Sequence, residues 1–549
     1  MPEQKLQSVA FPTLSEAQIR EFEAGTGAVS RPVRDGETLI AVGDRDFKFF
    51  IVKAGEIEIV DQSGDIPKTV TVHRKGEFTG DVSHLTGRAS VTRAVAKGDG
   101  EVAEVSSDML RAALNQCAIL SDILLQAFIA RRQLLRESGE FVGLRVIGSR
   151  YSTDTFRVRD FLAKNRVLFT WLDLETHPEV SQLLEHFGVT EAATPVVAMG
   201  DLLFLRNPSN RELADAIGIH QPLEHTIYDL VVVGAGPAGL AAAVYGASEG
   251  LHTLLIERTA PGGQAGASMR IENYLGFPTG ITGADLADRA MLQANKFGAR
   301  LSIPSQVTGL TWDKKYSVLQ LDSGETVTTK CLLIATGADY RRLEVEGCAG
   351  FEGKGVYYAA TPAEGQICRG MPVVLVGGGN SAGQAAVFLA QHASEVHLVI
   401  RGDSLYNSMS SYLARRIEHT RNITLSTRST IRRMRGDGHL DGVEVVHEPS
   451  GEARSIDTPA VFSFIGAVPR TEWLPPEIER DARGFIRTGA DVERSPHWTS
   501  RRAPFLLETS RAGVFAAGDV RSESAKRCAA AVGEGSMVVQ FVHEVLETM

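Results

Sequence analysis

A glycine-rich turn between two apolar runs carries the residue types best suited to binding a cofactor. The first run ends at Val233, the glycines Gly234, Gly236 and Gly239 follow in the spacing G-x-G-x-x-G, and the second run ends at Glu257. In such a turn the glycines permit a tight bend and let the main chain approach a pyrophosphate at the N-terminus of the next helix. The acid accepts hydrogen bonds from a ribose. The pattern therefore predicts a βαβ dinucleotide-binding unit.

A second turn of this kind follows the apolar run 373–376. The residues expected to contact its nucleotide are two glycines, two polar residues that open the next helix and the residue after the second strand: Gly377, Gly379, Asn380, Ser381 and Arg401. Arg401 stands where the first unit has an acid. Because a guanidinium there favours a ribose 2′-phosphate, we expect NADPH, with NADH as the alternative. Arg415 and Arg416 could add positive charge.

Length and composition place these two units in a larger protein. The 549 residues suffice for about three to five domains. No apolar run reaches the roughly 18 residues of a membrane span, and the N-terminus lacks a charged and then apolar leader, so we expect a cytoplasmic protein without a membrane partner. A net charge of −10 argues against nucleic acid as the main partner. The five cysteines form no C-x-x-C pair, so we expect neither a disulfide scaffold nor a metal site: Cys117, Cys331, Cys348, Cys368 and Cys528.

Residues 1–138 are expected to form a β-roll closed by a helix. Short apolar strands alternate with Gly and Asp turns up to about residue 105. A helical stretch follows, from residue 107 to about residue 137. This order of elements predicts a separate N-terminal domain.

Parts of this roll resemble cyclic nucleotide-binding domains. The matching segments are 49–59, 75–82 and 87–92. The resemblance implies a phosphate cassette in which Asp81 holds a ribose hydroxyl and the planar fork of Arg88 pairs with the cyclic phosphate. The candidate residues of this site are Gly80, Asp81, Arg88, Ala89 and Ser90. A roll that binds nothing, or that binds a different nucleotide, is the alternative.

Residues 139–222 alternate between strand and helix patterns, which predicts an α/β unit. The expected strand, helix, strand and helix lie at 144–148, 153–163, 167–172 and 178–187. The run A-T-P-V-V at 193–197 resembles the cis-proline turn of thioredoxin and glutaredoxin folds. That family exchanges disulfides through a C-x-x-C pair, and this chain has Ser152 and Thr155 there, so we expect a docking unit without redox chemistry. Binding of a thiol or peptide against Pro195 is the alternative.

Residues 223–549 resemble the low-molecular-weight thioredoxin reductases almost end to end. Besides the glycine turns, the resemblance rests on four motifs: P-G-G-Q at 261–264, E-N-Y-L-G-F-P at 272–278, A-T-G-A at 335–338 and G-D at 518–519. It implies that the first dinucleotide unit holds FAD. The further residues that it assigns to the cofactors are Gly263, Gln264, Asn273, Thr336, Gly337, Asp519, Arg527 and Cys528. Arg527 would stabilise the reduced flavin or, alternatively, face solvent.

The resemblance also divides the chain into domains. It implies a FAD-binding domain of residues 223–340 and 463–549, into which a NAD(P)H-binding domain of residues 341–462 is inserted. The predicted fold class is therefore multi-domain: a cyclic nucleotide-binding-like β-roll, an α/β thioredoxin-like unit and two Rossmann-like α/β domains.

The chain departs from the thioredoxin reductases at their redox centre. Where that family has C-A-T-C-D, this chain has Ala359 and Pro362 in place of the two cysteines and Ala363 in place of the acid. The nearest cysteines, Cys348 and Cys368, fit no exchange motif. We therefore assign no catalytic residue and expect classical electron transfer from flavin to a disulfide to be absent.

The expected activity is hydride transfer from NADPH to FAD, with electrons leaving to an external acceptor. A nucleotide on the β-roll could regulate it. The resemblance implies a homodimer, and the arginines between residues 415 and 435 could dock an acidic carrier of the ferredoxin or flavodoxin type. The alternatives are a redox or cyclic-nucleotide sensor with slow turnover, and reduction of thioredoxin by an atypical route.

Overall fold

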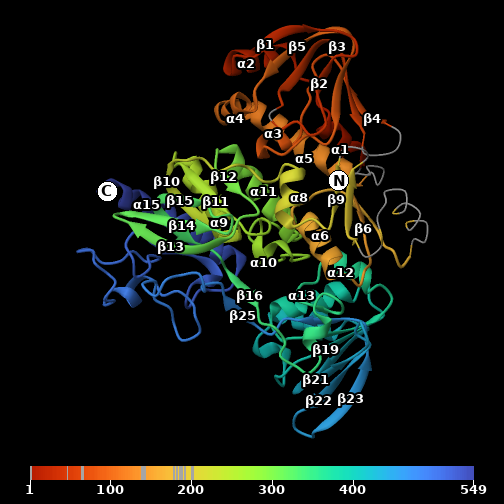
Figure 1. Cartoon of the computed structure of the whole chain (residues 1–549), viewed down its shortest axis with the longest axis vertical. Helices are drawn as coiled ribbons and strands as arrows, with labels where there is room; N and C mark the ends of the chain where they lie inside the picture. Colours follow the sequence, from red (N-terminus) through yellow and green to blue (C-terminus); the bar gives the residue numbers. More distant parts are fainter. Residues whose placement is uncertain are drawn as a thin grey trace.

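The computed structural model describes residues 3–45, 47–62, 67–137, 144–176, 180, 184, 190, 193–199 and 203–549. These residues form a β-roll, a four-stranded unit and two dinucleotide folds, which we name the first and the second (Figure 1). The predicted multi-domain fold class, a β-roll followed by α/β units, is confirmed. The helix expected at 178–187 lies almost wholly outside the described residues, as does the boundary expected at 138.

The β-roll is an antiparallel sheet with helices against it. In sheet order its strands are β1 (Val29–Val33), β5 (Arg93–Val105), β3 (Phe49–Asp61) and β4 (Lys68–His73), and β2 (Thr38–Ile40) pairs with β5. Its helices are α1 (Glu3–Ala10), α2 (Glu16–Thr26), α3 (Ser83–Thr86), α4 (Ser107–Gln116) and α5 (Ala118–Glu137). The buried rings of Phe49, Phe78 and Phe128 lie 5.7 to 6.4 Å apart and join the sheet to α5.

The four-stranded unit alternates strands and helices, as the sequence predicts. Its elements are β6 (Leu144–Ile147), α6 (Thr153–Lys164), β7 (Phe169–Leu172), β8 (Val196–Met199), β9 (Leu203–Arg206) and α8 (Asn210–Ala216). The sheet order is β7-β6-β8-β9, in which β6 runs parallel to β7 and antiparallel to β8. Ser152 caps α6, since its side chain accepts a hydrogen bond from the N–H of Thr155 (3.3 Å). The Thr194–Pro195 peptide bond before β8 is cis.

The first dinucleotide fold has a seven-stranded sheet. Its order is β12 (Arg300–Ser302), β11 (Thr253–Ile256), β10 (Ile227–Val233), β15 (Thr326–Ile334), β14 (Tyr316–Leu321) and β13 (Val307–Asp313), with β26 (Val514–Ala516) beside β15. The helices that the site uses are α9 (Pro237–Ser248), α10 (Gly263–Gly266), α11 (Gly283–Lys296) and α15 (Cys528–Thr548). Strands β12, β11, β10, β15 and β26 run parallel, so their carboxyl ends meet at one edge of the sheet.

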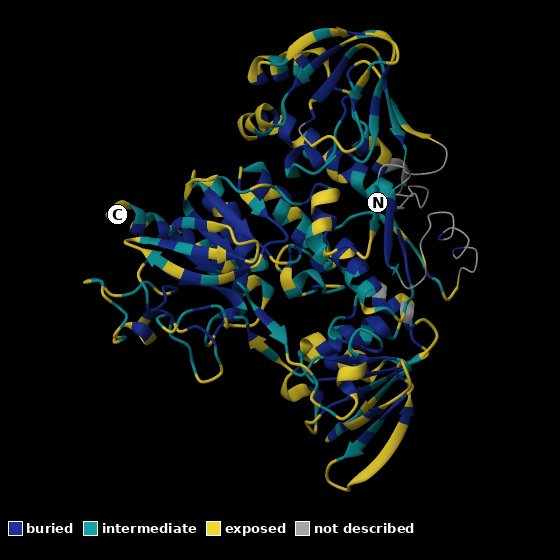
Figure 2. Cartoon of the chain, in the orientation of Figure 1, coloured by how far each residue is buried: buried dark blue, intermediate teal, exposed yellow. Residues whose placement is uncertain are grey.

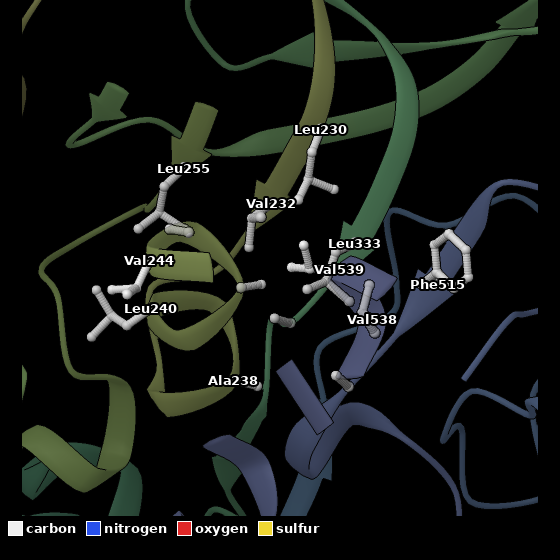
Figure 3. Packing of buried hydrophobic residues seen from close by; sticks show 14 of the residues in the cluster. Leu230, Val232, Ala238, Leu240, Val244, Leu255, Leu333, Phe515, Val538 and Val539 are labelled. Carbon is white, nitrogen blue, oxygen red and sulfur yellow. The ribbon is translucent and has the colours of Figure 1, made fainter. Parts of the chain in front are cut away.

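The hydrophobic core of this fold is built from segments that are far apart in the sequence. Side chains of β10, α9 and α15 interdigitate, with Val232, Leu240 and Val538 all buried (Figure 3). α9 is rich in Ala, which lets α15 lie close to it, and Phe515 of β26 fills the space beside them. The last residues of the chain therefore complete a core that begins at β10.

The second dinucleotide fold has a parallel five-stranded sheet. Its order is β17 (Val356–Tyr357), β24 (Val461–Ser463), β18 (Pro372–Val376), β19 (Glu395–Val399) and β20 (Ile423–Ser426). The helices α12 (Pro362–Ile367), α13 (Asn380–Leu389) and α14 (Ser411–Glu418) and the antiparallel strands β21 (Ser429–Arg435), β22 (Gly442–His447) and β23 (Glu452–Asp457) belong to the same fold. Two antiparallel strands, β16 (Ala338–Tyr340) and β25 (Ala467–Pro469), connect it to the first fold.

Burial follows this division into parts. Central strands of the two sheets, such as β11 and β18, are buried, whereas β23 is mostly exposed (Figure 2). Of the helices that the structure describes, none is both long enough and apolar enough to cross a membrane.

Candidate functional site

The first glycine-rich turn joins β10 to α9. Gly234 has a φ of +106°, and a Cβ there would overlap the carbonyl oxygen of Ala335. A Cβ on Gly239 would overlap the carbonyl oxygen of Gly234. Gly236 immediately precedes α9, and a Cβ there would meet no atom of the described residues within 4 Å. Two of the glycines are therefore required by packing, whereas Gly236 borders open space at a helix N-terminus, which fits a pyrophosphate.

Glu257 lies beside this turn, directly after β11. Its side chain is 8% exposed. One carboxylate oxygen accepts a hydrogen bond from the N–H of Ala235 (2.8 Å), and the other accepts one from the N–H of Thr259 (2.9 Å). Each oxygen keeps a lone pair for a further donor, so the carboxylate is held where it can also accept from a ribose hydroxyl.

The P-G-G-Q segment lies against the same turn. A Cβ on Gly263 would be 3.1 Å from the Cα of Gly236, and the side-chain amide of Gln264 donates to the carbonyl oxygen of Ala338. Asn273, in contrast, is exposed on the following loop, next to Leu275, whose side chain is 92% exposed. The structure thus brings Gly263 and Gln264 to the first turn and leaves Asn273 on the surface.

Thr336, Gly337 and Asp519 come together because the strands before them are neighbours. β15 pairs in parallel with β26, with Ile334 opposite Ala516. The hydroxyl of Thr336 donates to the carbonyl oxygen of Arg470 (2.9 Å). Burial raises the pKa of Asp519, an effect that Lys526 opposes. The carboxyl edge of the sheet therefore presents an acid in a partly desolvated position.

Two residues that the sequence analysis did not single out hold this C-terminal loop. The ammonium of Lys526 donates to the carbonyl oxygen of Asp519 (2.6 Å) and lies 4.3 Å from the centre of the Phe485 ring. Glu534 of α15 accepts a hydrogen bond from the N–H of Gly518 (2.6 Å) and forms an ion pair with Arg521. Glu534 could have been found from its place in the G-E-G run of an otherwise small-residue helix.

Arg527 and Cys528 stand at the start of α15. Arg527 precedes the helix and is exposed. Burial raises the pKa of the Cys528 thiol to about 11, and the charge of Asp519 adds to this, so the thiol is neutral at physiological pH. The same thiol contributes to the raised pKa of Tyr274, after burial, which places the 272–278 loop near this helix.

The second glycine-rich turn repeats the construction of the first. Gly377 has a φ of +140°, and a Cβ there would overlap the carbonyl oxygen of Phe464. Gly379 precedes α13, and a Cβ there would again meet no atom of the described residues within 4 Å. The side-chain oxygen of Asn380 accepts a hydrogen bond from the N–H of Ser410 (2.7 Å), and Ser381 is exposed. This turn also offers a helix N-terminus to a phosphate.

The arginines expected near the second nucleotide differ in their surroundings. Arg401 follows β19 and Ile400 and is exposed at the edge of the sheet. Arg415 is exposed on α14, whereas Arg416 forms an ion pair with Glu272 of the first fold (3.0 Å). Arg401 is therefore accessible at the end of the second strand of this unit, and Arg416 links the two folds.

Tyr340 of β16 lies between the two sites. Its side chain is largely buried, which raises its pKa; a hydrogen bond with the side chain of Ser381 opposes the shift, and the charge of Asp519 adds to it. Its ring packs edge-on against Phe464, with the centroids 5.3 Å apart. A residue of each site is thus within electrostatic reach of one tyrosine.

The segment between β17 and α12 contains Ala359 at the position that the resemblance assigns to the first redox cysteine, and α12 begins at Pro362. Glu364 of α12 is buried, which raises its pKa, and its carboxylate accepts a hydrogen bond from the N–H of Thr361 (2.8 Å). All five cysteines lie in the described part of the chain and are free. Burial raises the pKa of the Cys368 thiol to about 12.

The β-roll encloses a cavity of about 590 Å³ between its strands and α5. Its lining includes Gly80, Asp81 and Ser90 but, among the described residues, neither Arg88 nor Ala89. The guanidinium of Arg88 instead donates to the carbonyl oxygen of Asn165 in the four-stranded unit (3.0 Å). The expected cassette is therefore divided, with only part of it facing the cavity.

Arg131 of α5, which the sequence analysis missed, faces this cavity in place of Arg88. Burial lowers the pKa of its guanidinium to about 9, while the charges of Asp81 and Glu77 oppose the shift. It donates to the carbonyl oxygens of Ala10 (2.8 Å) and Phe78 (3.0 Å). Its position in the apolar repeat of α5, one helical turn after Ala127 and Phe128, was the sequence signal that it would be buried.

The chain matches two family models. Residues 228–535, more than half of the 549, match the pyridine nucleotide-disulphide oxidoreductase family, and residues 30–117 match the cyclic nucleotide-binding domain. Thioredoxin reductase of Treponema pallidum is 34% identical over 325 residues, which are 59% of this chain and 99% of that protein. Thioredoxin reductase of Bacillus subtilis is 33% identical over 327 residues, 59% of this chain and 97% of that protein.

A solved structure agrees with these matches. The structure of Lactococcus lactis thioredoxin reductase in its FR conformation superimposes with a TM-score of 0.53 and 28% identity, over 59% of this chain and 100% of that chain. The chain therefore belongs to the pyridine nucleotide-disulphide oxidoreductase family, with a thioredoxin reductase-like region for FAD and a nicotinamide nucleotide and a cyclic nucleotide-binding domain before it.

Proposed function

We propose that this protein oxidises NADPH through FAD and passes the electrons to an acceptor outside the chain, without a disulfide of its own. The observation that carries the proposal is that two glycine cradles lie on either side of Tyr340, while Ala359 and Pro362 replace the residues that would form an internal disulfide. When bound, FAD would accept a hydride from the nicotinamide and release electrons to a second substrate.

The residues that we propose for FAD are those at the first glycine turn, at the carboxyl edge of its sheet and at the start of α15: Gly234, Gly236, Gly239, Glu257, Gly263, Gln264, Asn273, Thr336, Gly337, Asp519, Arg527 and Cys528. The open space beside Gly236 supports the pyrophosphate site. For NADPH we propose Gly377, Gly379, Asn380, Ser381 and Arg401, with the open space beside Gly379 as support. We also propose the domain limits 1–138, 139–222, 223–340 with 463–549, and 341–462.

The burial of Cys528 and Cys368 supports the proposal that electrons do not pass through a cysteine of this chain. The pKa of Cys528 is raised to about 11 and that of Cys368 to about 12, so neither is a thiolate at neutral pH. A thiolate is the species that attacks a disulfide. Electrons would therefore leave directly from the flavin site.

The arginines of β21 give less support to the docking of an acidic electron carrier than their number in the sequence suggests. Arg432 and Arg433 form ion pairs with Glu444, and Arg435 forms one with Asp457. Much of its positive charge is thereby neutralised within the fold. We keep ferredoxin and flavodoxin as acceptors to be tested, together with quinones and molecular oxygen, and a homodimer as the assembly to be measured.

An anaerobic titration tests the proposal. NADPH is added to the purified flavoprotein while the flavin absorbance is followed, and candidate acceptors are then mixed with the reduced protein. We expect rapid bleaching and rapid reoxidation by at least one acceptor, with no NADPH-dependent reduction of thioredoxin or of a small aromatic disulfide. Disulfide reduction at a rate near that of bleaching would overturn the proposal.

We further propose that a ligand of the β-roll regulates this reaction. Arg88 donates to Asn165, and the amide of Asn165 donates to the carbonyl oxygen of Thr259 (2.9 Å), whose N–H is held by Glu257. This chain of contacts connects the roll to the first glycine turn. Calorimetry with cAMP, cGMP and cyclic dinucleotides tests this proposal. If none of them gives a heat of binding, the roll has a structural role only.

A further inference from the structure

The four-stranded unit contacts both dinucleotide folds, and the two ends of α6 take part in these contacts. On the first fold, Arg211 of α8 also donates to the carbonyl oxygen of Pro304 (3.4 Å). At the start of the helix the ring of Phe156 lies 6.0 Å from that of Tyr357 on β17, and Phe156 packs against the hydrophobic core of the second fold. Just before the helix, the ring of Tyr151 lies 5.5 Å from His439 of the second fold. Tyr357 is 6% exposed, so the unit covers the face beside the Ala359 segment.

A buried cation and a buried acid face each other across this contact. Arg159 of α6 is 5% exposed, with its guanidinium 3.4 Å from the centre of the Trp171 ring. Burial lowers the pKa of Arg159 to about 10, and the negative charges of Glu364 and then Asp173 oppose that shift. Glu364 is 2% exposed. Asp160 of α6 also acts on Glu364 and adds to the rise in its pKa, so both signs of charge on α6 lie within electrostatic reach of α12.

The other end of α6 is attached to the first fold. The residues directly after the helix are Asn165 and Arg166. The amide of Asn165 donates to the carbonyl oxygen of Thr259 (2.9 Å), and Arg166 forms ion pairs with Asp285 and Asp288 of α11 (3.0 Å each). A helix of 12 residues is about 18 Å long and stiff, so α6 spans the distance between the two folds as a rigid element (Figure 1).

Besides α6, a few contacts among the described residues join the two folds, including Met269 of the first fold, which packs against the core of the second. The chain passes between the two folds twice, through β16 and through β25. These two strands pair over three residue pairs, from Ala338–Pro469 to Tyr340–Ala467. The ion pair between Arg416 and Glu272 is partly exposed and contributes little by itself. Two strands and these few contacts permit rotation of one fold against the other.

We infer that α6 is an intramolecular strut: it docks on the second fold beside Ala359, anchors on α11 of the first fold, and so holds Ser381 near Tyr340 and Asp519. The partner of the face beside Ala359 is thus the chain's own four-stranded unit. The inference rests on the proposed function for its kinetic consequence, because the orientation that α6 fixes is the one that would bring the two cofactors together. Phe156 and Arg166 are positioning residues at the two ends of the strut.

Three variants of the full-length flavoprotein test the strut. Phe156→Ala removes the contact with Tyr357, Arg166→Ala removes the anchor on α11, and the double variant removes both. Phe204→Ala is the matched control, because Phe204 is a half-buried aromatic of the same unit whose cluster, within the described residues, belongs to that unit alone. The measurements are the rate of flavin bleaching after rapid mixing with NADPH, the dissociation constant of NADPH and amide hydrogen exchange over α12.

Each single variant should slow bleaching about tenfold, equivalent to about 1.4 kcal/mol, because the docked arrangement is populated less. NADPH affinity should stay unchanged, and exchange over α12 should rise in Phe156→Ala. The double variant should be slower than either single variant, because Arg166→Ala weakens the attachment to the first fold while Asn165 still donates to Thr259. Phe204→Ala should bleach at the parent rate.

Unchanged bleaching and unchanged α12 exchange in Phe156→Ala and Arg166→Ala would overturn the strut, as would an equal loss in Phe204→Ala. A parent protein that NADPH does not bleach would instead refute the proposed function, and the exchange measurement would still decide whether α6 docks.

Discussion

The two glycine-rich turns of this protein are alike in build and unlike in charge. Gly234 and Gly377 are both forced by a carbonyl oxygen that leaves no room for a Cβ, and Gly236 and Gly379 both border open space at a helix N-terminus. The strand that follows the first turn leads to a buried carboxylate, Glu257, whereas the one that follows the second leads to an exposed arginine. The two turns thus share their steric surroundings, and we propose that the residue after the second strand of each unit determines which nucleotide binds there.

The comparison also shows where each turn obtains its rigidity. The carboxylate of Glu257 is hydrogen-bonded to two main-chain N–H groups, one of them within the turn itself, so the acid supports the loop that it serves. The side chain of Arg401 is exposed, and among the described residues it makes no comparable hydrogen bond to the second turn. A change at Glu257 should therefore affect folding and binding together, and a change at Arg401 should affect binding alone.

Gly234→Ala is the variant with the largest expected effect, and it tests the steric requirement for glycine in the first turn. The new Cβ would overlap the carbonyl oxygen of Ala335 at a φ of +106°, which costs about 3 kcal/mol. We expect protein that purifies without flavin and melts several degrees lower, as measured by flavin absorbance per chain and thermal unfolding. Gly236→Ala is the matched control: it should melt like the parent but bind FAD more weakly. Full flavin content in Gly234→Ala would contradict the steric argument.

Arg401→Ala tests the difference in charge. Loss of a charge-assisted contact to the 2′-phosphate should raise KM for NADPH about tenfold, equivalent to about 1.4 kcal/mol, and leave KM for NADH unchanged. Steady-state kinetics with both nucleotides measure this. Arg421→Ala, an exposed arginine of the same fold, should alter neither. If Arg401→Ala raises both KM values equally, the arginine does not read the phosphate.

Much of this construction could be predicted from the sequence. Apolar runs, glycine spacing and strand-end residues are local, so the two turns and their sheets follow from short stretches such as Leu230 to Gly239. Ala359 and Pro362, at the positions that the resemblance assigns to the redox cysteines, can be identified from an equally short stretch. These features depend on neighbours along the chain, which a sequence displays directly.

The rest depends on contacts between distant parts. Arg88 has the right residue type for a phosphate site, yet its guanidinium is taken by a carbonyl oxygen 77 residues away, in another unit. Arg131 occurs in the apolar pattern of α5 but is drawn into the β-roll cavity by carbonyl groups of the loops around it. The two ends of α6 gave no sign of their roles, because packing between units leaves no periodicity in a sequence.

A smaller effect is expected at Asp519 of the first site, because ionising this buried carboxyl lowers the stability of the folded protein. Burial raises the pKa of this carboxyl, so the stability that its protonated form contributes is present at acid pH and is lost as the pH rises through the raised pKa. Asp519→Asn should therefore raise the melting temperature of flavin-free protein at pH 7.5, and the gain should shrink as the pH falls through the raised pKa towards the ordinary value of 3.8.

The same variant should weaken FAD binding, which separates stability from function at one residue. Thermal unfolding of flavin-free protein across that pH range and a flavin titration at pH 7.5 are the two measurements. A gain in melting temperature that is independent of pH would show that ionisation of Asp519 is not its cause.

The smallest expected effect concerns the cysteines, and it bears on the outlet of the electrons. The thiols of Cys331 and Cys368 have pKa values raised to about 12 and that of Cys528 to about 11, chiefly by burial, so each is protonated at pH 7.5 and is a poor redox group. Replacing any one of the five cysteines by alanine should leave acceptor turnover within about twofold of the parent, provided that the melting temperature is retained. Cys528 opens the helix next to Asp519. A specific loss of turnover in Cys528→Ala, with normal bleaching by NADPH, would therefore show that this residue is needed for the step from reduced flavin to the acceptor and would contradict an outlet that uses no cysteine.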